Sequence, residues 1–306
     1  MAVRNQLTKM NRYEKLFNRL TAGEKILMDC GTGTEVERRG IPQVESAWNS
    51  GGAKTHPDIL RQIHSDYISH GAEIVISNTF ATARHILQDA GWEEHFDLLN
   101  RRGVELAAEA RDQSGKSDVL VAAGISHWSW GTHPTAEQLR INIADQAAIM
   151  TEAGADLIML EMMVNIEKTA ILIEESQKTG LPTWVGFSTE VDDEGVVRLW
   201  EGESLIDALE AIKPYAVPLI SIMHTEVQYI DRSLDVLQAN WSGPVGVYAH
   251  SGPYAEGKWL FDKTITPEAY AGASQRWLNR GVQIIGGCCG LGVEHMKALN
   301  LVMNQA

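Results

Sequence analysis

Two adjacent cysteines, Cys288 and Cys289, are the residues of this sequence with the clearest capacity for chemistry. They follow the apolar run at 282–285 and are flanked by glycines in the stretch Gly-Gly-Cys-Cys-Gly. Two thiols at the end of a buried strand suit a soft, thiophilic metal such as zinc. Adjacent cysteines fit disulfide geometry poorly, so the alternative is a pair of buried structural thiols. Spacing alone leaves both interpretations open.

The composition is that of an ordinary globular protein, and it excludes several classes of function. Of the 306 residues, 44% are hydrophobic and 22% are charged, and the formal net charge is −14. Such an acidic chain argues against a nucleic-acid partner, which requires a basic surface. No apolar run reaches the ~18 residues of a membrane span, and the polar N-terminus argues against a secretory signal. With three cysteines in total, we expect a protein of the reducing cytoplasm without membrane contact.

Eight short apolar segments alternate with segments of helical length along the whole chain. Most of the eight are continuous in apolar residues, which is typical of parallel strands covered on both faces. The expected strands are residues 25–30, 73–78, 118–124, 156–161, 182–188, 216–223, 244–250 and 282–287. Eight such units predict an α/β protein with the (β/α)8 TIM barrel architecture. An open doubly wound sheet is the alternative, but the chain lacks the Gly-x-Gly-x-x-Gly turn that would favour it.

Helical periodicity and glycine stops support the barrel. Apolar residues recur at helical spacing in segments 57–70, 135–153 and 165–179. Several expected helices end before a glycine suited to a C-cap, namely Gly71, Gly154, Gly180 and Gly281. Residues 4–20 predict an extra helix that covers the bottom of the barrel. Because no linker or low-complexity tract divides the chain, we expect one domain over residues 1–306, with residues 1–22 as an N-terminal helical extension.

Residues that follow the expected strands are the candidates for an active site, because a barrel of this kind builds its site there. Asp29 and Glu161 come directly after apolar runs, where an unpaired carboxylate would be costly. We expect them to meet a cation, a metal or a ligand amine; a helix cap or an internal salt bridge is the alternative. The other polar and aromatic residues after the strands are Ser77, Asn78, Thr79, Phe80, Ser126, His127, Trp128, Trp130, Ser188, Thr189, His224, Thr225, His250 and Ser251.

These segments resemble one known family, the zinc-dependent homocysteine S-methyltransferases, which include betaine–homocysteine methyltransferases. The resemblance extends from about residue 23 to residue 300, and the double cysteine is its most specific element. The matching pieces are residues 28–35, 39–40, 78–80, 154–156 with Glu161, Tyr248, 251–252 and 285–290 with His295. The fold of this family is a (β/α)8 barrel, in agreement with the count of strands.

The resemblance implies a definite chemistry. Zinc held by three protein ligands keeps one position open for the thiol of homocysteine, which loses its proton there. The thiolate then takes a methyl group from a sulfonium, quaternary ammonium or similar donor, and methionine is formed. The family also implies that Asp29 and Glu161 hold the amino group of homocysteine.

The methyl donor needs a site for its positive charge, and aromatic faces attract such cations. Trp48 lies where family members carry a tryptophan near the donor, and Phe80 lies where they often carry Tyr or Phe. We expect these two residues to contact substrate together with Trp128, Asn78 and Ser126. The alternative for the tryptophans is that they only fill space around the barrel rim.

The third zinc ligand is the point where the sequence departs most from the family. The family takes it from a cysteine after the sixth strand, but this chain has Met223 and His224 there. A thioether is a poor zinc ligand and an imidazole a good one, so His224 with Cys288 and Cys289 predicts a Cys2His site. His250, at the end of the seventh strand, is the alternative third ligand.

The loops after the third and fourth strands also differ from the family pattern, which favours altered substrates. The expected function is zinc-dependent methyl transfer to the thiol of homocysteine from an onium donor such as S-methylmethionine, betaine or a dimethylsulfonium compound. The alternatives are another thiol acceptor, a different metal-assisted reaction that uses His224, His250 and Glu161, and a ligand-binding homologue without turnover. The expected partners are therefore a small-molecule thiol and a methyl donor, and a homo-oligomer is open.

Overall fold

Eight parallel strands form one sheet in the computed structural model, which describes residues 10–43, 47–255 and 257–304. In sheet order they are β1 (Ile26–Leu27), β12 (Ile284–Gly287), β9 (Val245–His250), β8 (Ile220–Glu226), β5 (Thr183–Phe187), β4 (Leu157–Met163), β3 (Leu120–Ile125) and β2 (Ile74–Ile76). A parallel bridge between Met28 and Ile74 brings the two edges of the sheet together. The sheet is therefore a nearly closed barrel, and the predicted (β/α)8 fold is confirmed.

All eight predicted strands are present, although some of their ends differ from the prediction. The largest difference is in β8, which begins at Ile220 instead of residue 216. Pro218 lies in the missing stretch and has no N–H to donate to a neighbouring strand. Both β4 and β8 also continue past the predicted ends, and the extension of β8 carries the candidate site residues His224 and Thr225.

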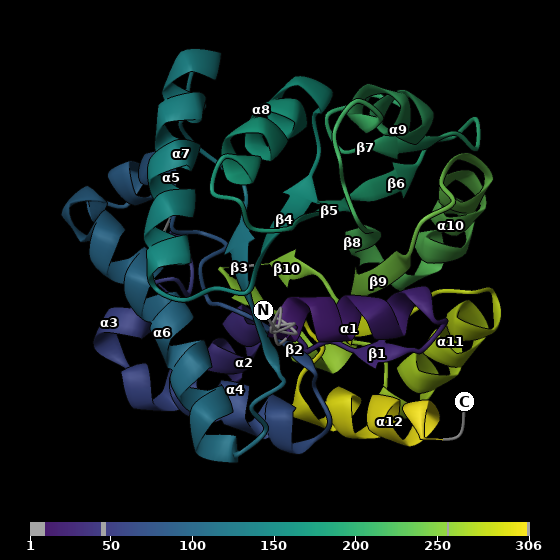
Figure 1. Cartoon of the computed structure of the whole chain (residues 1–306), viewed down its shortest axis with the longest axis horizontal. Helices are drawn as coiled ribbons and strands as arrows, with labels where there is room; N and C mark the ends of the chain where they lie inside the picture. Colours follow the sequence, from purple (N-terminus) through teal and green to yellow (C-terminus); the bar gives the residue numbers. More distant parts are fainter. Residues whose placement is uncertain (1–9, 44–46, 256, 305–306) are drawn as a thin grey trace, which may run out of the picture.

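Helices surround the barrel (Figure 1). They are α2 (Thr32–Arg38), α3 (Gly52–Thr55), α4 (Pro57–Ser69), α5 (Arg84–Asp89), α6 (Phe96–Ser114), α7 (Ala136–Glu152), α8 (Ile166–Gln177), α9 (Leu205–Ile212), α10 (Val227–Asn240), α11 (Pro267–Asn279) and α12 (Val293–Met303). The three helices predicted from periodicity are α4, α7 and α8, and each ends within two residues of the prediction. All four predicted C-cap glycines have the positive φ that this position requires. Among the described residues, no helix is long and apolar enough to cross a membrane.

The extra N-terminal helix is α1 (Arg12–Thr21), which lies across one end of the barrel (Figure 1). Its polar side chains pair with residues just before the strands: Lys15 with Asp118 at 2.7 Å and Arg12 with Asp156 at 3.3 Å. Its buried leucines pack on the apolar residues inside the barrel. Residues 4–9 of the predicted helix lie outside the described residues. Because α1 covers the amino ends of the strands, the carboxyl ends form the open mouth.

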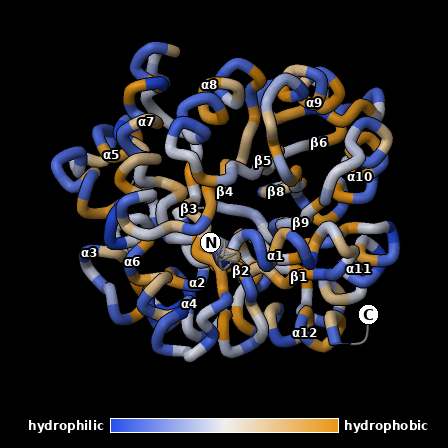
Figure 2. The backbone as a smooth tube through the Cα atoms, in the orientation of Figure 1, coloured by the Kyte–Doolittle hydropathy of each residue, from blue (hydrophilic) through white to orange (hydrophobic). Residues whose placement is uncertain are grey.

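The apolar core has two layers, one inside the barrel and one between the strands and the helices. Figure 2 shows hydrophobic stretches along the central strands and a mixture of hydrophobic and hydrophilic residues along the surrounding helices. Two antiparallel hairpins, which were not predicted, follow β5 and β9. They are formed by β6 (Thr189–Val191) with β7 (Val197–Leu199) and by β10 (Tyr254–Ala255) with β11 (Lys258–Trp259). Both hairpins follow carboxyl ends of strands and therefore extend the rim of the mouth.

Candidate active site

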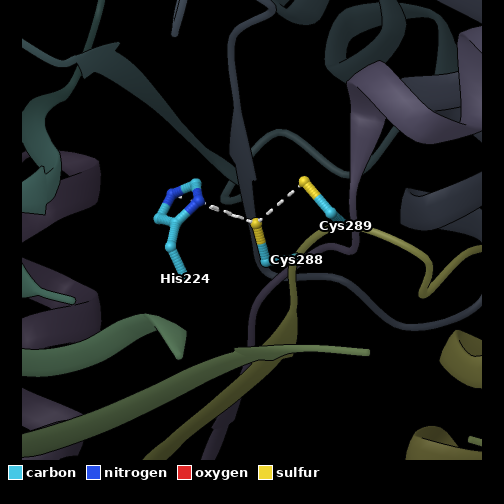
Figure 3. A group of neighbouring side chains, drawn as sticks. All are labelled: His224, Cys288 and Cys289. Carbon is cyan, nitrogen blue, oxygen red and sulfur yellow. Dashed lines mark hydrogen bonds between the residues drawn. The ribbon is translucent and has the colours of Figure 1, made fainter. Parts of the chain in front are cut away.

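Cys288 and Cys289 follow β12 at the mouth of the barrel, next to His224 from β8 (Figure 3). The two sulfurs are 3.6 Å apart, and Sγ of Cys288 is 3.0 Å from Nδ1 of His224. One ligand atom from each of the three residues lies within 4.8 Å of the others. Two thiols and one imidazole at such spacing fit the ligand set of a zinc site that keeps one position open. The structure thus brings together the three residues predicted as metal ligands.

Glycines hold the cysteine loop close to its neighbours. Gly290 has a φ of +81°, and a Cβ there would lie 2.0 Å from the carbonyl oxygen of Ser251. A Cβ on Gly31, in the loop after β1, would lie 2.5 Å from the carbonyl oxygen of Cys288. Larger residues at either position would push the loop outward, so the glycines set the place of the two thiols.

His224 reaches the thiols because the end of β8 is irregular. Met223 faces the barrel interior, where its Sδ would lie 2.2 Å from a Cβ on Gly186. In a regular strand the next side chain would face the surrounding helices. Instead, the register between β8 and β9 shifts after Met223, and His224 adopts a φ of +48°. This bulge turns the imidazole back toward the mouth, and such strained backbone is concentrated at functional sites.

Glu161 and Phe80 hold the imidazole of His224 in place. Oε2 of Glu161 lies 3.2 Å from Nε2 of His224, and the Phe80 ring stacks on the imidazole with centroids 5.0 Å apart. Because Glu161 occupies Nε2, Nδ1 is the nitrogen that faces Cys288. A carboxylate behind a metal-binding histidine commonly fixes its orientation and its tautomer. The sequence predicted a cation, a metal or a ligand amine as the partner of Glu161, with an internal salt bridge as the alternative, but it did not identify His224 as that partner.

The charges of this group stabilise one another. Burial acts to lower the pKa of His224, but its contacts with Cys289 and Glu161 prevail and raise the pKa to about 9. The hydrogen bond from Cys288 lowers the pKa of Cys289 to about 6, whereas burial raises the pKa of Cys288. At neutral pH the metal-free group therefore pairs a thiolate with an imidazolium. A metal ion could replace the protons of this group, since binding requires deprotonated ligands.

Asp29 is fully buried beneath the mouth. Its carboxylate accepts hydrogen bonds from the Ile76 N–H at 2.8 Å and from the Tyr248 hydroxyl at 3.3 Å. Burial raises the pKa of Asp29 well above its ordinary value; the Ile76 bond opposes this, and the nearby charge of Glu161 adds to it. Asp29 is absent from the pocket wall, whereas Tyr248 and Glu161 are part of it. Asp29 therefore lies behind the pocket wall and contacts it through the Tyr248 hydroxyl.

A pocket at the mouth leads to the two cysteines. Its wall contains most of the predicted site residues, namely Trp48, Asn78, Phe80, Glu161, His224, Cys288 and Cys289. It also contains Ser77, a candidate from the end of the second strand, and residues that were not predicted for the site: Gly31, Thr32, Gly33, Thr34, Asn49, Ser50, Ile76, Ala81 and Tyr248. Segment 28–35, which leads into α2, and Tyr248 could have been predicted to lie at the site, because both belong to the family pattern. No comparable signal marked Asn49 or Ser50.

Ser126 and Trp128, like Asp29, were predicted as substrate contacts but are absent from the pocket wall. Ser126 is fully buried, and its hydroxyl accepts a hydrogen bond from the Trp128 N–H at 3.2 Å. Ser126 thus supports the loop after β3, while Trp128 contacts the rings of Trp130 and Trp200. Both residues shape the rim of the mouth from this loop.

Six aromatic rings form a closed circuit at the rim. Neighbouring ring centroids are 5.7–6.4 Å apart, in the order Trp48, Trp130, Trp128, Trp200, His250, Trp259 and back to Trp48. Trp200 and Trp259 come from the unpredicted hairpin segments. The cation–π contacts of the described residues involve other rings, those of Phe261, Trp92 and Phe96. His250, the alternative metal ligand, lies in this circuit and not in the group of His224 and the two thiols.

Fold and site together define a (β/α)8 barrel with a Cys2His group suited to a metal at the carboxyl ends of its strands. The family model for homocysteine S-methyltransferase matches residues 26–303. The chain therefore belongs to the homocysteine S-methyltransferase family, and the resemblance inferred from the sequence is confirmed.

Individual relatives agree with this assignment. Homocysteine S-methyltransferase 1 of Zea mays is 27% identical over 312 residues, which cover 92% of this chain and 95% of the relative. A selenocysteine methyltransferase of Astragalus bisulcatus is 24% identical, with coverage of 88% and 89%. The solved structure of the homocysteine methyltransferase MmuM from Escherichia coli, in its metallated form, has a TM-score of 0.78 and 22% identity. That similarity covers 95% of this chain and 99% of the MmuM chain, and it supports the fold.

Gly124 of β3 leaves the space that the Glu161 carboxylate occupies, so a substitution at Gly124 tests the role of Glu161. A Cβ at this position would lie 2.3 Å from Oε1 of Glu161 and 2.9 Å from Cγ2 of Ile76. We predict that Gly124→Ala displaces the carboxylate from His224 and weakens zinc binding by about 10- to 100-fold, as expected for a lost outer-shell partner. A competition titration with a chelator measures the affinity. Gly272→Ala is the control, since nothing lies within 4 Å of a Cβ there; equal affinities in the two variants would contradict the role of Glu161.

The burial of His127, in the loop after β3, makes the stability of the fold depend on pH. Its Nε2 has no partner among the described residues, and burial, with a smaller contribution from Lys168, lowers its pKa to about 3. An unfolded histidine takes up its proton near pH 6.5. The contribution of neutral His127 to stability is therefore complete above pH 6.5 and declines as the pH falls toward 3.

We predict that His127→Phe makes the free energy of unfolding fall less steeply below pH 6.5, by up to one proton or about 1.4 kcal/mol per pH unit. Urea denaturation at several pH values measures this slope. The exposed His133 supplies the control variant, His133→Phe, which keeps the wild-type slope. A wild-type slope in His127→Phe as well would contradict the prediction.

Proposed function

We propose that this protein transfers a methyl group from an onium donor to the thiol of homocysteine, with methionine as a product. The observation that carries the proposal is the cluster of His224, Cys288 and Cys289 in the wall of the pocket at the barrel mouth. Family membership supports a small-molecule thiol as the acceptor. The relatives named for homocysteine and selenocysteine methyl transfer favour an amino acid with a terminal thiol or selenol.

The donor set of the cluster fits zinc, because two thiols and an imidazole are ligands that this metal prefers. His224 would supply the third ligand that the family takes from a cysteine, while the neighbouring Met223 thioether faces the barrel interior. Zinc bound to these residues supplies a Lewis acid that lowers the pKa of a substrate thiol in the remaining position.

The residues of the chain prepare the cluster for this role. Cys289 ionises easily because the Cys288 hydrogen bond lowers its pKa to about 6. Glu161 and the stacked Phe80 hold the His224 ring at the angle at which Nδ1 faces the sulfurs. The geometry of the site therefore does not depend on the bound substrate to order it, which reduces the entropic cost of reaching the reactive arrangement.

Asp29 and Glu161 supply negative charge for the ammonium group of homocysteine. Their mutual repulsion contributes to the raised pKa of Asp29, after the larger effect of burial. A cationic amine bound nearby relieves this repulsion and lets both carboxylates remain ionised. The two acids thus favour an acceptor that carries an amine over a simple thiol.

The aromatic rim serves the methyl donor. Trp48 and Phe80 present ring faces in the pocket wall, and the circuit extends these faces outward. A sulfonium or quaternary ammonium group is stabilised over such faces. In the transfer, the acceptor sulfur forms a bond to the methyl carbon as the bond from that carbon to the onium centre breaks. The donor leaves as a neutral thioether or amine, and the thiol proton is released to solvent.

Methyl transfer itself is tested by incubating the purified protein with homocysteine and one onium donor at a time. We expect mass spectrometry to detect methionine with at least one of S-methylmethionine, betaine and dimethylsulfoniopropionate. Cys288→Ser should reduce the rate by at least about 100-fold, because loss of a Lewis acid removes several kcal/mol of stabilisation. Absence of methionine with every donor would contradict the proposed reaction.

Metal content tests the ligand set independently of the reaction. We expect about one zinc per chain in protein purified without chelator, and its loss in Cys288→Ala, Cys289→Ala and His224→Ala. His224→Cys should retain zinc, because it restores a three-cysteine set. His250→Ala is the matched control and should keep its metal. Zinc retained by His224→Ala but lost from His250→Ala would reverse the assignment of the third ligand.

A further inference from the structure

Asn49, in the segment between α2 and α3, places an unpaired polar atom in the pocket wall. Its side chain is 4% exposed, and its Oδ1 has no hydrogen-bond partner among the described residues. Most buried polar groups of native proteins are paired, and leaving an acceptor without a donor is costly. An orphaned oxygen inside a substrate pocket therefore points to a donor group that arrives with the ligand.

Contacts within the chain fix which atom of the Asn49 amide is left over. Nδ2 donates to the carbonyl oxygen of Gly33 at 2.7 Å, so an exchange of the two amide atoms would set two oxygens against each other. The main-chain carbonyl of Asn49 accepts from Nδ2 of Asn78 at 2.9 Å and from the Gly52 N–H at 3.2 Å. Asn78, predicted as a substrate contact, thus uses its amide to position this segment. Oδ1 is the one oxygen of Asn49 that these contacts leave unpaired.

The backbone around Asn49 is held in an unusual conformation. Trp48 adopts a φ of +47°, which is rare for a large side chain and is concentrated at functional sites. The N–H of Ser50 donates to the carbonyl oxygen of Ala47 at 3.1 Å, and the Ser50 hydroxyl donates to the same oxygen. The indole N–H of Trp48 is also buried without a partner among the described residues. This short segment therefore offers one acceptor and one donor to a ligand.

Asn49 belongs to the donor side of the pocket. The proposed function assigns the acceptor thiol to the Cys2His cluster and the acceptor amine to Asp29 and Glu161. Trp48, the neighbour of Asn49, belongs instead to the aromatic circuit that faces the onium group. The next polar contact along this side is Oδ1 of Asn49, which can accept from an N–H group but cannot satisfy a fully methylated nitrogen.

We propose that Asn49 is a specificity-determining residue for the methyl donor: its Oδ1 accepts a hydrogen bond from an amine of the donor, so that the pocket selects onium donors that carry an N–H group. This inference rests on the proposed methyl transfer. A donor without an amine leaves Oδ1 unpaired in the complex, and sites built to hydrogen-bond a substrate N–H discriminate strongly against analogues that lack it.

Two sulfonium donors that differ in the amine provide the test, with homocysteine as the common acceptor. S-methylmethionine carries a carboxylate and an amine, whereas 4-(dimethylsulfonio)butanoate has the same chain length and carries the carboxylate alone. For the wild-type protein we expect kcat/KM to favour the amine-bearing donor by about 10- to 100-fold, the range for a hydrogen bond that involves a charged group. Asn49→Ala should bring this ratio close to one, mainly through the KM of the amine-bearing donor.

Two further variants separate this role from a structural one. Asn100 is a fully buried asparagine whose amide is paired with Thr82 and Phe96, and it is absent from the pocket wall. Asn100→Ala should lower the thermal midpoint but leave the donor ratio at the wild-type value. Asn49→Ser removes Oδ1 but keeps a hydroxyl that can donate to the Gly33 carbonyl in place of Nδ2, so it should also reduce the preference for the amine. That variant also tests the proposal should Asn49→Ala fail to fold.

The outcomes distinguish the inference from the reaction on which it rests. No methionine from any donor would overturn the proposed function. Methyl transfer with the same donor ratio in wild type, Asn49→Ala and Asn49→Ser would overturn the role of Asn49 alone. A higher KM for homocysteine at an unchanged donor ratio would place Asn49 on the acceptor side, and turnover with betaine only would also contradict the inference.

Discussion

The bulge at the end of β8 is the constraint on which the rest of the site depends. It turns His224 out of the alternation of a regular strand and sets its Nδ1 3.0 Å from the sulfur of Cys288. The left-handed backbone of His224 is strained, so other contacts must hold it. Glu161 on Nε2 and Phe80 on the ring face supply them. The arrangement therefore depends on four strands, because His224 comes from β8, the thiols follow β12, Glu161 comes from β4 and Phe80 follows β2.

The barrel explains why these strand ends can cooperate. α1 and its ion pairs cover the amino ends of the strands, so the carboxyl ends form the face at which loops converge. Small residues on the inner wall then admit large groups: Gly124 leaves room for the Glu161 carboxylate, and Gly186 leaves room for Met223. The acidic and thiol groups lie deep in the mouth, and the tryptophans lie at its rim. In the proposed reaction, the deep polar groups serve the acceptor and the aromatic rim serves the donor.

The barrel could be predicted from the sequence, because continuous apolar strands that alternate with helices ending at glycines fit few other topologies. It also predicted that His224, Cys288 and Cys289 lie together, since strand ends meet at one face and the cysteine pair is distinctive. It was insufficient for the features that depend on local irregularity. The left-handed backbone conformations of His224 and Trp48 could not be predicted from their residue types, because large side chains rarely adopt this conformation. The aromatic circuit was likewise hidden, since two of its members come from hairpin segments with no strong periodicity. Asn49 gave no signal because its role depends on which of its atoms are already bonded.

X-ray absorption at the zinc edge tests the central claim, that His224 and the two thiols share one metal ion, most directly. The account predicts two sulfur neighbours at about 2.3 Å and one imidazole nitrogen at about 2.0–2.1 Å, with a third sulfur on addition of homocysteine. A spectrum without sulfur neighbours, or one in which homocysteine adds none, would contradict the account.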